Sequence, residues 1–169
     1  MNGRLLGIGC ALAALALDQG TKALALGAPA LAHGVELLPI LNLVLVRNHG
    51  VSFGMLGGIV PWWALILLSL AIVAAIVIWL WRSQSRVVGV ALGLVIGGAL
   101  GNVIDRVRFQ GVTDFLDFHL GAYHWPAFNF ADVTIVCGVT LLLVDGLFWE
   151  KQSEQAQGSP APAREGSES

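Results

Sequence analysis

Long hydrophobic runs alternate with shorter polar segments along this chain of 169 residues. A helix that crosses a membrane needs about 20 mainly apolar residues. Four runs have about this length, although charged residues interrupt the first and the last of them. The pattern therefore predicts four transmembrane helices, at residues 5–26, 59–81, 87–104 and 129–149.

The segment between the first two runs has a different pattern. Residues 36–46 are rich in aliphatic side chains but too short to span a membrane, and Pro39 disfavours a helix. We expect strands that lie at the membrane surface. The predicted fold class is thus an all-α membrane protein with four transmembrane helices and a small extracytoplasmic β-like platform between helices 1 and 2.

Two domains of unequal kind are expected. Residues 1–149 would form the four-helix membrane domain, and residues 150–169 are polar and rich in Ser, Glu, Ala, Pro and Gly. A segment with so few apolar side chains cannot bury a core, so we expect a disordered tail.

Positive charge indicates the orientation, because cytoplasmic segments carry an excess of Lys and Arg. Five such residues lie on the side of the two termini: Arg4, Arg82, Arg86, Lys151 and Arg164. Four lie on the opposite side: Lys22, Arg47, Arg106 and Arg108. Two of these four, Lys22 and Arg106, are near acidic residues and available for ion pairs. Both termini and the tail are therefore expected in the cytoplasm.

Composition agrees with a membrane protein. The chain is 56% hydrophobic and 12% charged, whereas soluble domains contain about 25% charged residues. The net charge of −2 gives no basis for nucleic-acid binding.

Acidic residues gather where the third and fourth hydrophobic runs meet, and such residues at a span usually mark a functional site. A helix rises 1.5 Å per residue, which places Asp18 about 20 Å and Lys22 about 26 Å along the first helix. Both then reach the outer boundary, where the third run ends and the fourth begins. We expect these polar residues to converge there: Asp18, Lys22, Asn102, Asp105, Arg106, Asp114 and Asp132.

Two close carboxylates in a poorly solvated site share one proton, because repulsion separates their pKa values. The ionised member can then take a proton from water while the protonated member polarises a carbonyl group. Asp114 and Asp132 fit these roles, but Asp117 is a strong rival. Asp18 and Lys22 are four residues apart on one helix face, so we expect an ion pair that supports the site.

Two other kinds of function use similar residues. A proton-coupled transporter could use the same carboxylates, but it should line a path through the bilayer with polar groups. Here the polar cluster stays at one boundary, which favours an enzyme. A zinc site is not expected, because the four histidines show no H-x-x-x-H spacing.

Five motifs together resemble the lipoprotein signal peptidases, the signal peptidase II family. They are LDQGTK at 17–22, RNHGVSFG at 47–54, GGALGNVIDR at 97–106, GVTDF at 111–115 and FNFAD at 128–132. Each motif is weak alone, but all five occur in the order of the family. The resemblance covers residues 17–145.

The resemblance implies an aspartic endopeptidase of the bacterial cytoplasmic (inner) membrane, with its active site near the outer face. It implies Asp114 and Asp132 as the catalytic dyad. It also implies a set of supporting or substrate-binding residues: Asp18, Lys22, Asn48, Asn102, Asp105, Arg106 and Asn129.

The family removes signal peptides from prolipoproteins by cutting before a cysteine that carries diacylglycerol. The implied partners are therefore such prolipoproteins and membrane lipids, together with globomycin-type inhibitors that block the dyad. The resemblance implies no metal and no other cofactor.

Overall fold

The structure, a computed structural model, describes residues 2–50 and 60–157. It is mostly helical, with one small antiparallel sheet, so the expected helices and the expected β-structure are both present in outline. The helices are α1 (Gly3–Leu26), the short 3-10 helix η1 (Pro29–His33), α2 (Trp62–Arg82), α3 (Arg86–Phe109) and α4 (Phe130–Gln157). The strands are β1 (Val35–Leu38), β2 (Leu41–Asn48), β3 (Val112–Leu120) and β4 (Tyr123–His124).

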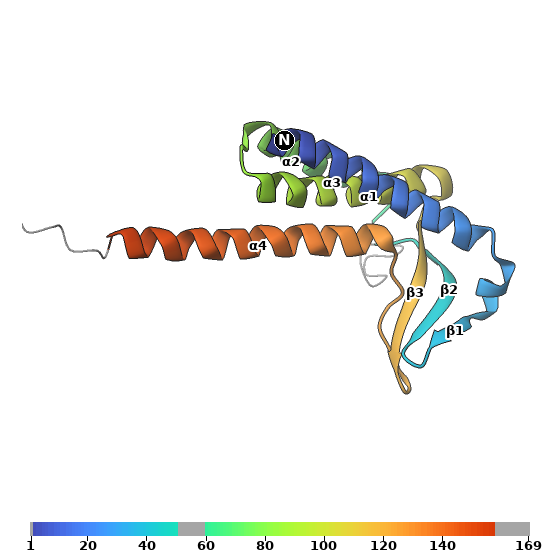
Figure 1. Cartoon of the computed structure of the whole chain (residues 1–169). Coiled ribbons are helices and arrows are strands. Elements are labelled where there is room, and N and C mark those ends of the chain that lie inside the picture. Colours follow the sequence, from blue (N-terminus) through green and yellow to red (C-terminus); the bar gives the residue numbers. More distant parts are fainter. Residues whose placement is uncertain (1, 51–59, 158–169) are drawn as a thin grey trace, which may run out of the picture.

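Helix α3 is the centre of the helical part and packs against α1, α2 and α4. Figure 1 shows α1, α2 and α3 as one group, with α4 running along it on the side from which the sheet projects. A cluster of buried apolar side chains joins α2 to α3: Val73, Leu80, Leu92 and Ile96. Many of the other large apolar side chains of α2 are exposed, among them Trp63, Leu67 and Leu68, as expected for a helix in lipid.

Glycines at every fourth position bring α3 close to α1. Gly93, Gly97 and Gly101 form part of one stripe on α3, because residues four apart share a helix face. A Cβ atom added at Gly93 would overlap the carbonyl group of Gly7 in α1. One added at Gly101 would overlap the carboxylate of Asp18. This approach between backbones is typical of helix packing in membranes, where small residues line the contact.

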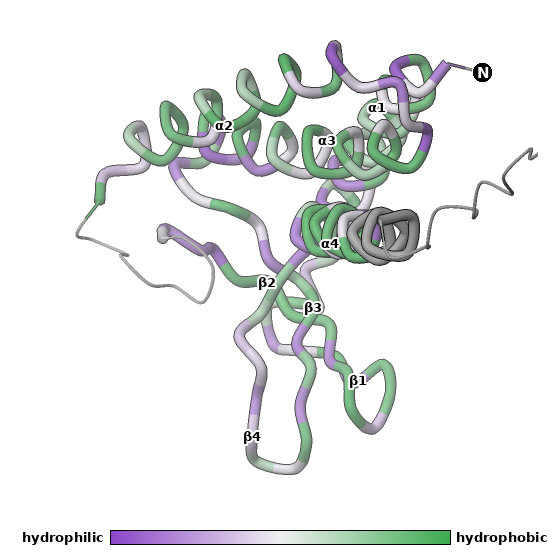
Figure 2. Tube along the Cα trace, turned by 90° about the vertical axis from the view of Figure 1, so that its left-hand side faces the viewer, coloured by the Kyte–Doolittle hydropathy of each residue, from purple (hydrophilic) through white to green (hydrophobic). Residues whose placement is uncertain are grey.

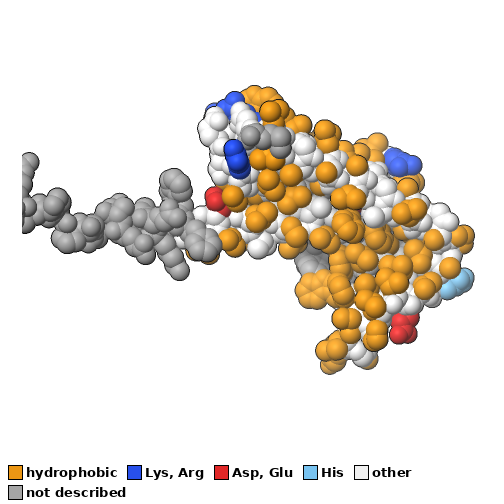
Figure 3. Space-filling view, viewed as in Figure 1, with side chains coloured by type: hydrophobic (Ala, Val, Ile, Leu, Met, Phe, Trp, Pro, Cys, Tyr) orange, Lys and Arg blue, Asp and Glu red, His pale blue; other side chains and the backbone are white. Residues whose placement is uncertain are grey.

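Three of the described helices are long and apolar enough to cross a membrane: α2, α3 and the Phe130–Leu147 part of α4. Helix α1, which the sequence predicted as the first of four spans, does not reach this level of apolarity. The reason is that Asp18, Gln19 and Lys22 interrupt its apolar sequence. On the face seen in Figure 3, hydrophobic side chains cover both helices and sheet, and charged side chains are few.

Helix α4 differs from its predicted end. It continues to Gln157, so residues 150–157 are helical where the sequence predicted the start of a disordered tail. Glu, Lys, Gln and Ala dominate this stretch, and these are good helix formers, so the helix continues beyond its apolar part. The predicted disorder of residues 158–169 concerns a segment outside the described residues.

The sheet contains more of the chain than the predicted platform. Its strands are antiparallel and lie in the order β1-β2-β3-β4. Only β1 and β2 come from the segment between α1 and α2, with Pro39 in the turn between them. Strands β3 and β4 come from the segment between α3 and α4. Figure 2 shows the sheet projecting away from the helices.

The junction between α3 and β3 positions the first residues of β3. Gln110 ends α3 in the left-handed conformation, with φ of 57°, and the chain then turns into β3. The backbone N–H of Thr113 donates to Asp105 Oδ2 at 2.8 Å, which ties the strand to the last turns of α3. Asp114 is therefore held at the end of the helices.

A substitution in the glycine stripe tests the close contact of α1 with α3. We expect Gly93→Ala to lower the free energy of unfolding by about 1–3 kcal/mol, because the added methyl group forces the helices apart. Thermal unfolding in detergent micelles would measure this. Gly9→Ala is the matched control, since a Cβ atom there meets nothing within 4 Å. Equal stability of the two variants would contradict the interpretation.

Candidate active site

Asp114 lies on β3 with its carboxylate almost fully buried, at 2% exposure. Two side-chain amides donate to it from other elements. Asn129, which directly precedes α4, donates through Nδ2 to Oδ1 at 2.6 Å. Asn48, at the end of β2, donates through Nδ2 to Oδ2 at 3.0 Å. Both carboxylate oxygens of Asp114 are therefore fixed in direction.

Asp132 lies in the first turn of α4, and its carboxylate also accepts two hydrogen bonds. Asn102 of α3 donates through Nδ2 to Oδ1 at 3.1 Å, and the backbone N–H of Asn129 donates to Oδ2 at 3.2 Å. In return, Oδ1 of Asn129 accepts from the backbone N–H of Asp132 at 3.2 Å. This reciprocal pair is a capping box, which fixes the start of a helix.

Asn129 thus contacts both carboxylates, one through its side chain and one through its backbone. Its side-chain Nδ2 also donates to Asn102 Oδ1 at 3.4 Å. Asp114 and Asp132, which the sequence predicted to converge, therefore share Asn129 as a hydrogen-bond partner.

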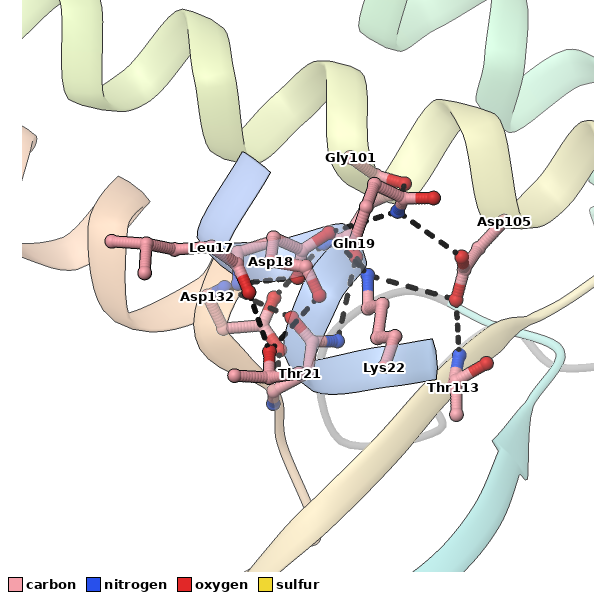
Figure 4. Close-up of polar contacts among 12 residues, drawn as sticks. Leu17, Asp18, Gln19, Thr21, Lys22, Gly101, Asp105, Thr113 and Asp132 are labelled. Atoms are coloured by element: carbon pink, nitrogen blue, oxygen red, sulfur yellow. Dashed lines mark hydrogen bonds and ion pairs between the residues drawn. The ribbon is translucent and has the colours of Figure 1, made fainter. Parts of the chain in front are cut away.

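A buried group of charges supports this arrangement (Figure 4). Lys22 Nζ lies 3.0 Å from Asp18 Oδ2 and 3.6 Å from Asp105 Oδ2, and it donates to Asn102 Oδ1 at 2.8 Å. All three charged side chains are at most 2% exposed. The expected ion pair of Asp18 with Lys22 is confirmed, and Asp105 shares the same lysine.

Asp18 also acts on α4. Its Oδ1 accepts from the backbone N–H of Ala131, the second residue of that helix, at 2.9 Å. The first turn of a helix has free N–H groups and a partial positive charge, so a carboxylate is favourable there. Asp18 therefore links the ion pair in α1 to the turn that carries Asp132.

Arg106 lines the same cavity as Asp114 and Asp132 and is 8% exposed. Its guanidinium group donates to the backbone carbonyl of Gly50 at 3.0 Å and to that of Asn102 at 3.4 Å. Asp105, its neighbour in sequence, is bound to Lys22 and Thr113 instead. Arg106 thus brings the start of the loop after β2 to the end of α3.

A cavity of about 780 Å³ opens next to these residues. Its polar lining consists of Asn48, Asn102, Arg106, Asp114 and Asp132. The rest is apolar and comes from β3, from the segment between β4 and α4, and from α4: Val112, Phe118, Trp125, Pro126, Ala127, Phe128, Val133, Ile135, Val136 and Cys137. The cavity is thus large enough for a small ligand, with polar groups concentrated near the two carboxylates.

Burial raises the pKa of Asp114 to about 6. The hydrogen bonds from Asn129 and Asn48 act against this shift by favouring the carboxylate, and the charge of Asp132 adds to it. A carboxyl group with such a pKa holds its proton to near-neutral pH. It can then donate a proton or a hydrogen bond to a substrate, which an exposed aspartate cannot do at the same pH.

Asp117, the rival for the catalytic role, is not in the cavity. Side chains of a strand point alternately to opposite faces, and Val112, Asp114 and Phe118 of β3 line the cavity. Asp117 lies on the other face, with His124 Nδ1 at 2.9 Å from its Oδ2. Burial alone would raise the pKa of Asp117, but the hydrogen bonds from His124 and Asn42 outweigh it and lower the pKa.

Gln19 also belongs to the polar cluster, although it is not among the residues predicted from the sequence. Its Nε2 donates to Asp18 Oδ2 at 3.1 Å, to the carbonyl of Gly101 at 3.2 Å and to Asp105 Oδ1 at 3.4 Å. A polar amide beside a charged residue inside an apolar helix was the available signal. Among residues 2–50 and 60–157, no three His, Cys, Asp or Glu side chains form a group that could hold a metal ion.

The buried charges give a stability test. We expect Lys22→Met to lower the free energy of unfolding by about 3–5 kcal/mol, because it leaves Asp18 and Asp105 buried without their cation. Thermal unfolding in detergent micelles would measure the loss. Arg82→Met, which removes an exposed cation at the end of α2, is the control and should change stability little. A small effect of Lys22→Met would show that the pair is dispensable.

Comparison with known proteins extends this picture. The profile of the family described as signal peptidase (SPase) II matches residues 10–148. A lipoprotein signal peptidase of Methylocella silvestris is 42% identical over 156 residues, which cover 88% of this chain and 89% of that protein. One of Beijerinckia indica is 40% identical over 170 residues, covering 98% and 99%.

Solved structures agree. One described as a bacterial membrane enzyme matches with a TM-score of 0.79 at 29% identity, covering 92% of this chain and 94% of that one. A second with the same description has a TM-score of 0.73 at 31% identity, covering 83% and 92%. The sequence match spans nearly the whole membrane part of the chain, and the fold agrees with it. The protein therefore belongs to the signal peptidase II family of membrane peptidases.

Proposed function

We propose that this protein is an aspartic endopeptidase that removes signal peptides from bacterial prolipoproteins. It would cut before the cysteine that carries diacylglycerol, with Asp114 and Asp132 as the catalytic dyad. The observation that supports this most is the pair of carboxylates held by one asparagine at the polar end of a largely apolar cavity. The relatives named lipoprotein signal peptidase support the choice of substrate.

The proposed mechanism divides two roles between the carboxylates. Asp132 is the ionised member and takes a proton from the attacking water, since the first turn of α4 favours a negative charge there. Asp114 is the protonated member and donates to the carbonyl oxygen as the water adds to the carbonyl carbon. The tetrahedral intermediate then collapses: Asp114 takes back a proton from one hydroxyl group as the carbonyl reforms, the C–N bond breaks, and the proton held by Asp132 passes to the leaving amine. Both carboxyl groups thereby return to their starting protonation states.

The supporting residues would act by position. Asn48, Asn102 and Asn129 hold the carboxylates through hydrogen bonds, and Arg106 adds positive charge at the edge of the cavity. Asp18, Lys22 and Asp105 form the buried layer that fixes these residues in place.

A lipid-bearing substrate fits the rest of the cavity. Apolar side chains of α4 and of the segment before it form most of the lining. The diacylglycerol chains would contact this apolar part, while the peptide bond lies at the polar end. Membrane lipids would surround the opening of this cavity.

We also propose that α1 spans the membrane as the fourth transmembrane helix. Its charged residues Asp18 and Lys22 are at most 2% exposed, because they face α3 and α4 rather than lipid. Buried charges of this kind are tolerated inside a helix bundle. The sheet extends across the direction of the helices in Figure 1, so it would lie along the outer membrane surface. Both termini would be cytoplasmic, in the inner membrane.

The position of the polar cluster supports a peptidase over a proton-coupled transporter. The charged and amide side chains gather where the helices meet the sheet. A transporter needs polar groups along a path through the bilayer. The apolar sequence of α2 does not offer such a path.

Cleavage of a diacylglyceryl-modified prolipoprotein by the purified protein tests the proposal. We expect wild-type cleavage with and without EDTA, and loss of at least about 100-fold in kcat for Asp114→Asn and for Asp132→Asn, since each removes one proton-transfer group. Asp117→Asn should stay active, because Asp117 lies on the other face of β3.

Folding of each variant would be checked by thermal unfolding. An inactive Asp117→Asn beside an active Asp114→Asn would contradict the choice of dyad. A folded wild type that cleaves nothing would contradict the peptidase itself.

The pKa of Asp114 predicts a pH dependence. If Asp114 must hold a proton in the free enzyme, kcat/KM should fall as the pH rises through about 6, where that group ionises. Asn48→Ala removes a hydrogen bond that favours the carboxylate, so the pKa rises and the fall should move to higher pH. A pH profile of kcat/KM for both proteins measures this. A shift to lower pH in Asn48→Ala would exclude Asp114 as the proton donor.

A further inference from the structure

Three aromatic side chains form one wall of the cavity: Phe118 of β3, with Trp125 and Phe128 of the segment that leads to α4. We call these three residues the aromatic wall. The rings of Phe118 and Phe128 stack with their centroids 5.6 Å apart. Trp125 is 58% exposed and Phe118 is 43% exposed, so the wall faces the open side of the cavity.

Backbone hydrogen bonds attach this wall to β3 at two places. The N–H of Trp125 donates to the carbonyl of Phe118 at 2.7 Å. The N–H of Phe128 donates to the carbonyl of Leu116 at 2.9 Å, and the N–H of Leu116 donates back at 2.9 Å. Strand β4, which leads into the wall, has only the two residues Tyr123–His124. A two-stranded pairing this short is marginal by itself.

A side-chain contact on the opposite face of the sheet reinforces this short pairing. Nδ1 of His124 lies 2.9 and 3.0 Å from the two carboxylate oxygens of Asp117. Asn42 of β2 donates to the same carboxylate at 3.1 Å, so the contact spans three strands. The ring of His119, opposite His124 in the pairing, stacks on it with centroids 5.1 Å apart.

The contact between His124 and Asp117 thus joins the two residues that precede Trp125 and Phe118 in the sequence. His124 directly precedes Trp125, and Asp117 directly precedes Phe118. Trp125 directly follows the end of β4, and its N–H donates to the carbonyl of Phe118 at 2.7 Å, so the position of Trp125 depends on that of His124. Movement of His124 away from Asp117 would turn Trp125 away from the cavity.

We propose that Asp117 and His124 are positioning residues that hold the aromatic wall against the apolar part of the substrate. The inference rests on the proposed peptidase function and adds residues to it. Asp117 contacts neither the dyad nor the cavity, so it acts through Phe118 and Trp125. The lowered pKa of Asp117 supports this, because an ionised carboxylate accepts from His124 and has no proton to donate.

Two measurements on the full chain in nanodiscs test the proposal. The first is hydrogen–deuterium exchange without substrate: Asp117→Ala and His124→Ala should speed exchange of the Trp125 and Phe128 amides. The second is steady-state cleavage of a diacylglyceryl peptide. Both variants should raise KM about fivefold, the change expected for a partly exposed ion pair, with kcat within about twofold of the wild type.

Conservative and neutral variants complete the design. Asp117→Asn retains an acceptor for His124 and should restore most of the wild-type KM. The double variant Asp117→Ala/His124→Ala should raise KM by less than the product of the two single effects, because each single substitution already removes the contact between His124 and Asp117. Glu36→Ala removes an exposed carboxylate from the edge strand β1, which does not pair with β3 or β4, and should change neither measurement.

The outcomes separate this proposal from the proposed function. Unchanged amide exchange in Asp117→Ala overturns the proposal, and so does faster exchange with an unchanged KM. A large and equal loss of kcat in Asp117→Ala and Asp117→Asn also overturns it, since that pattern identifies a catalytic carboxylate. A wild type that cleaves nothing contradicts the peptidase alone, and faster exchange in the variants would still support the role of the pair in holding the wall.

Discussion

The burial of Lys22 between Asp18 and Asp105 is the constraint on which the site depends. A charge removed from water is costly unless its partners are close, so this contact fixes the separation of α1 from α3. The same carboxylate of Asp18 receives the N–H of Ala131 and so fixes the start of α4. The positions of Asp114 and Asp132 therefore depend on an ion pair that has no part in the proposed chemistry.

Close packing makes this ion pair possible. In lipid, helices gain little from hiding apolar surface, so contact depends on backbones that fit together. The glycine stripe of α3 lets α1 approach, and at Gly101 the missing side chain leaves room for the Asp18 carboxylate itself. The glycines of α3 thus provide the space that the buried charged side chains occupy.

The sequence predicted the helices, which follow from local apolar patterns, and the level of the polar residues, which follows from their distance along each helix. The apolar runs predicted the helices, and the rise per residue brought Asp18, Lys22 and Asp132 to one level. The residues alone left Asp114 and Asp117 as alternatives for the catalytic role. The family resemblance favoured Asp114.

The sheet shows where such prediction stops. Strand β3 pairs with β2, which lies more than 60 residues earlier in the chain. The sequence of neither strand identifies the other as its partner. The opposite directions of Asp114 and Asp117 follow from the strand period, but only once β3 is known to be a strand. Gln19 shows the same limit, since its three acceptors come together only when α1 lies against α3.

The hydrogen bond from Ala131 to Asp18 joins residues 113 positions apart in the chain. A nascent chain that ends after α3 contains Asp18, Lys22 and Asp105 but neither Asn129 nor Asp132. Assembly of the site waits for the start of α4, the last helix to be synthesised. The complete site is for this reason a property of nearly the whole polypeptide, and no partial product that ends before α4 contains both carboxylates.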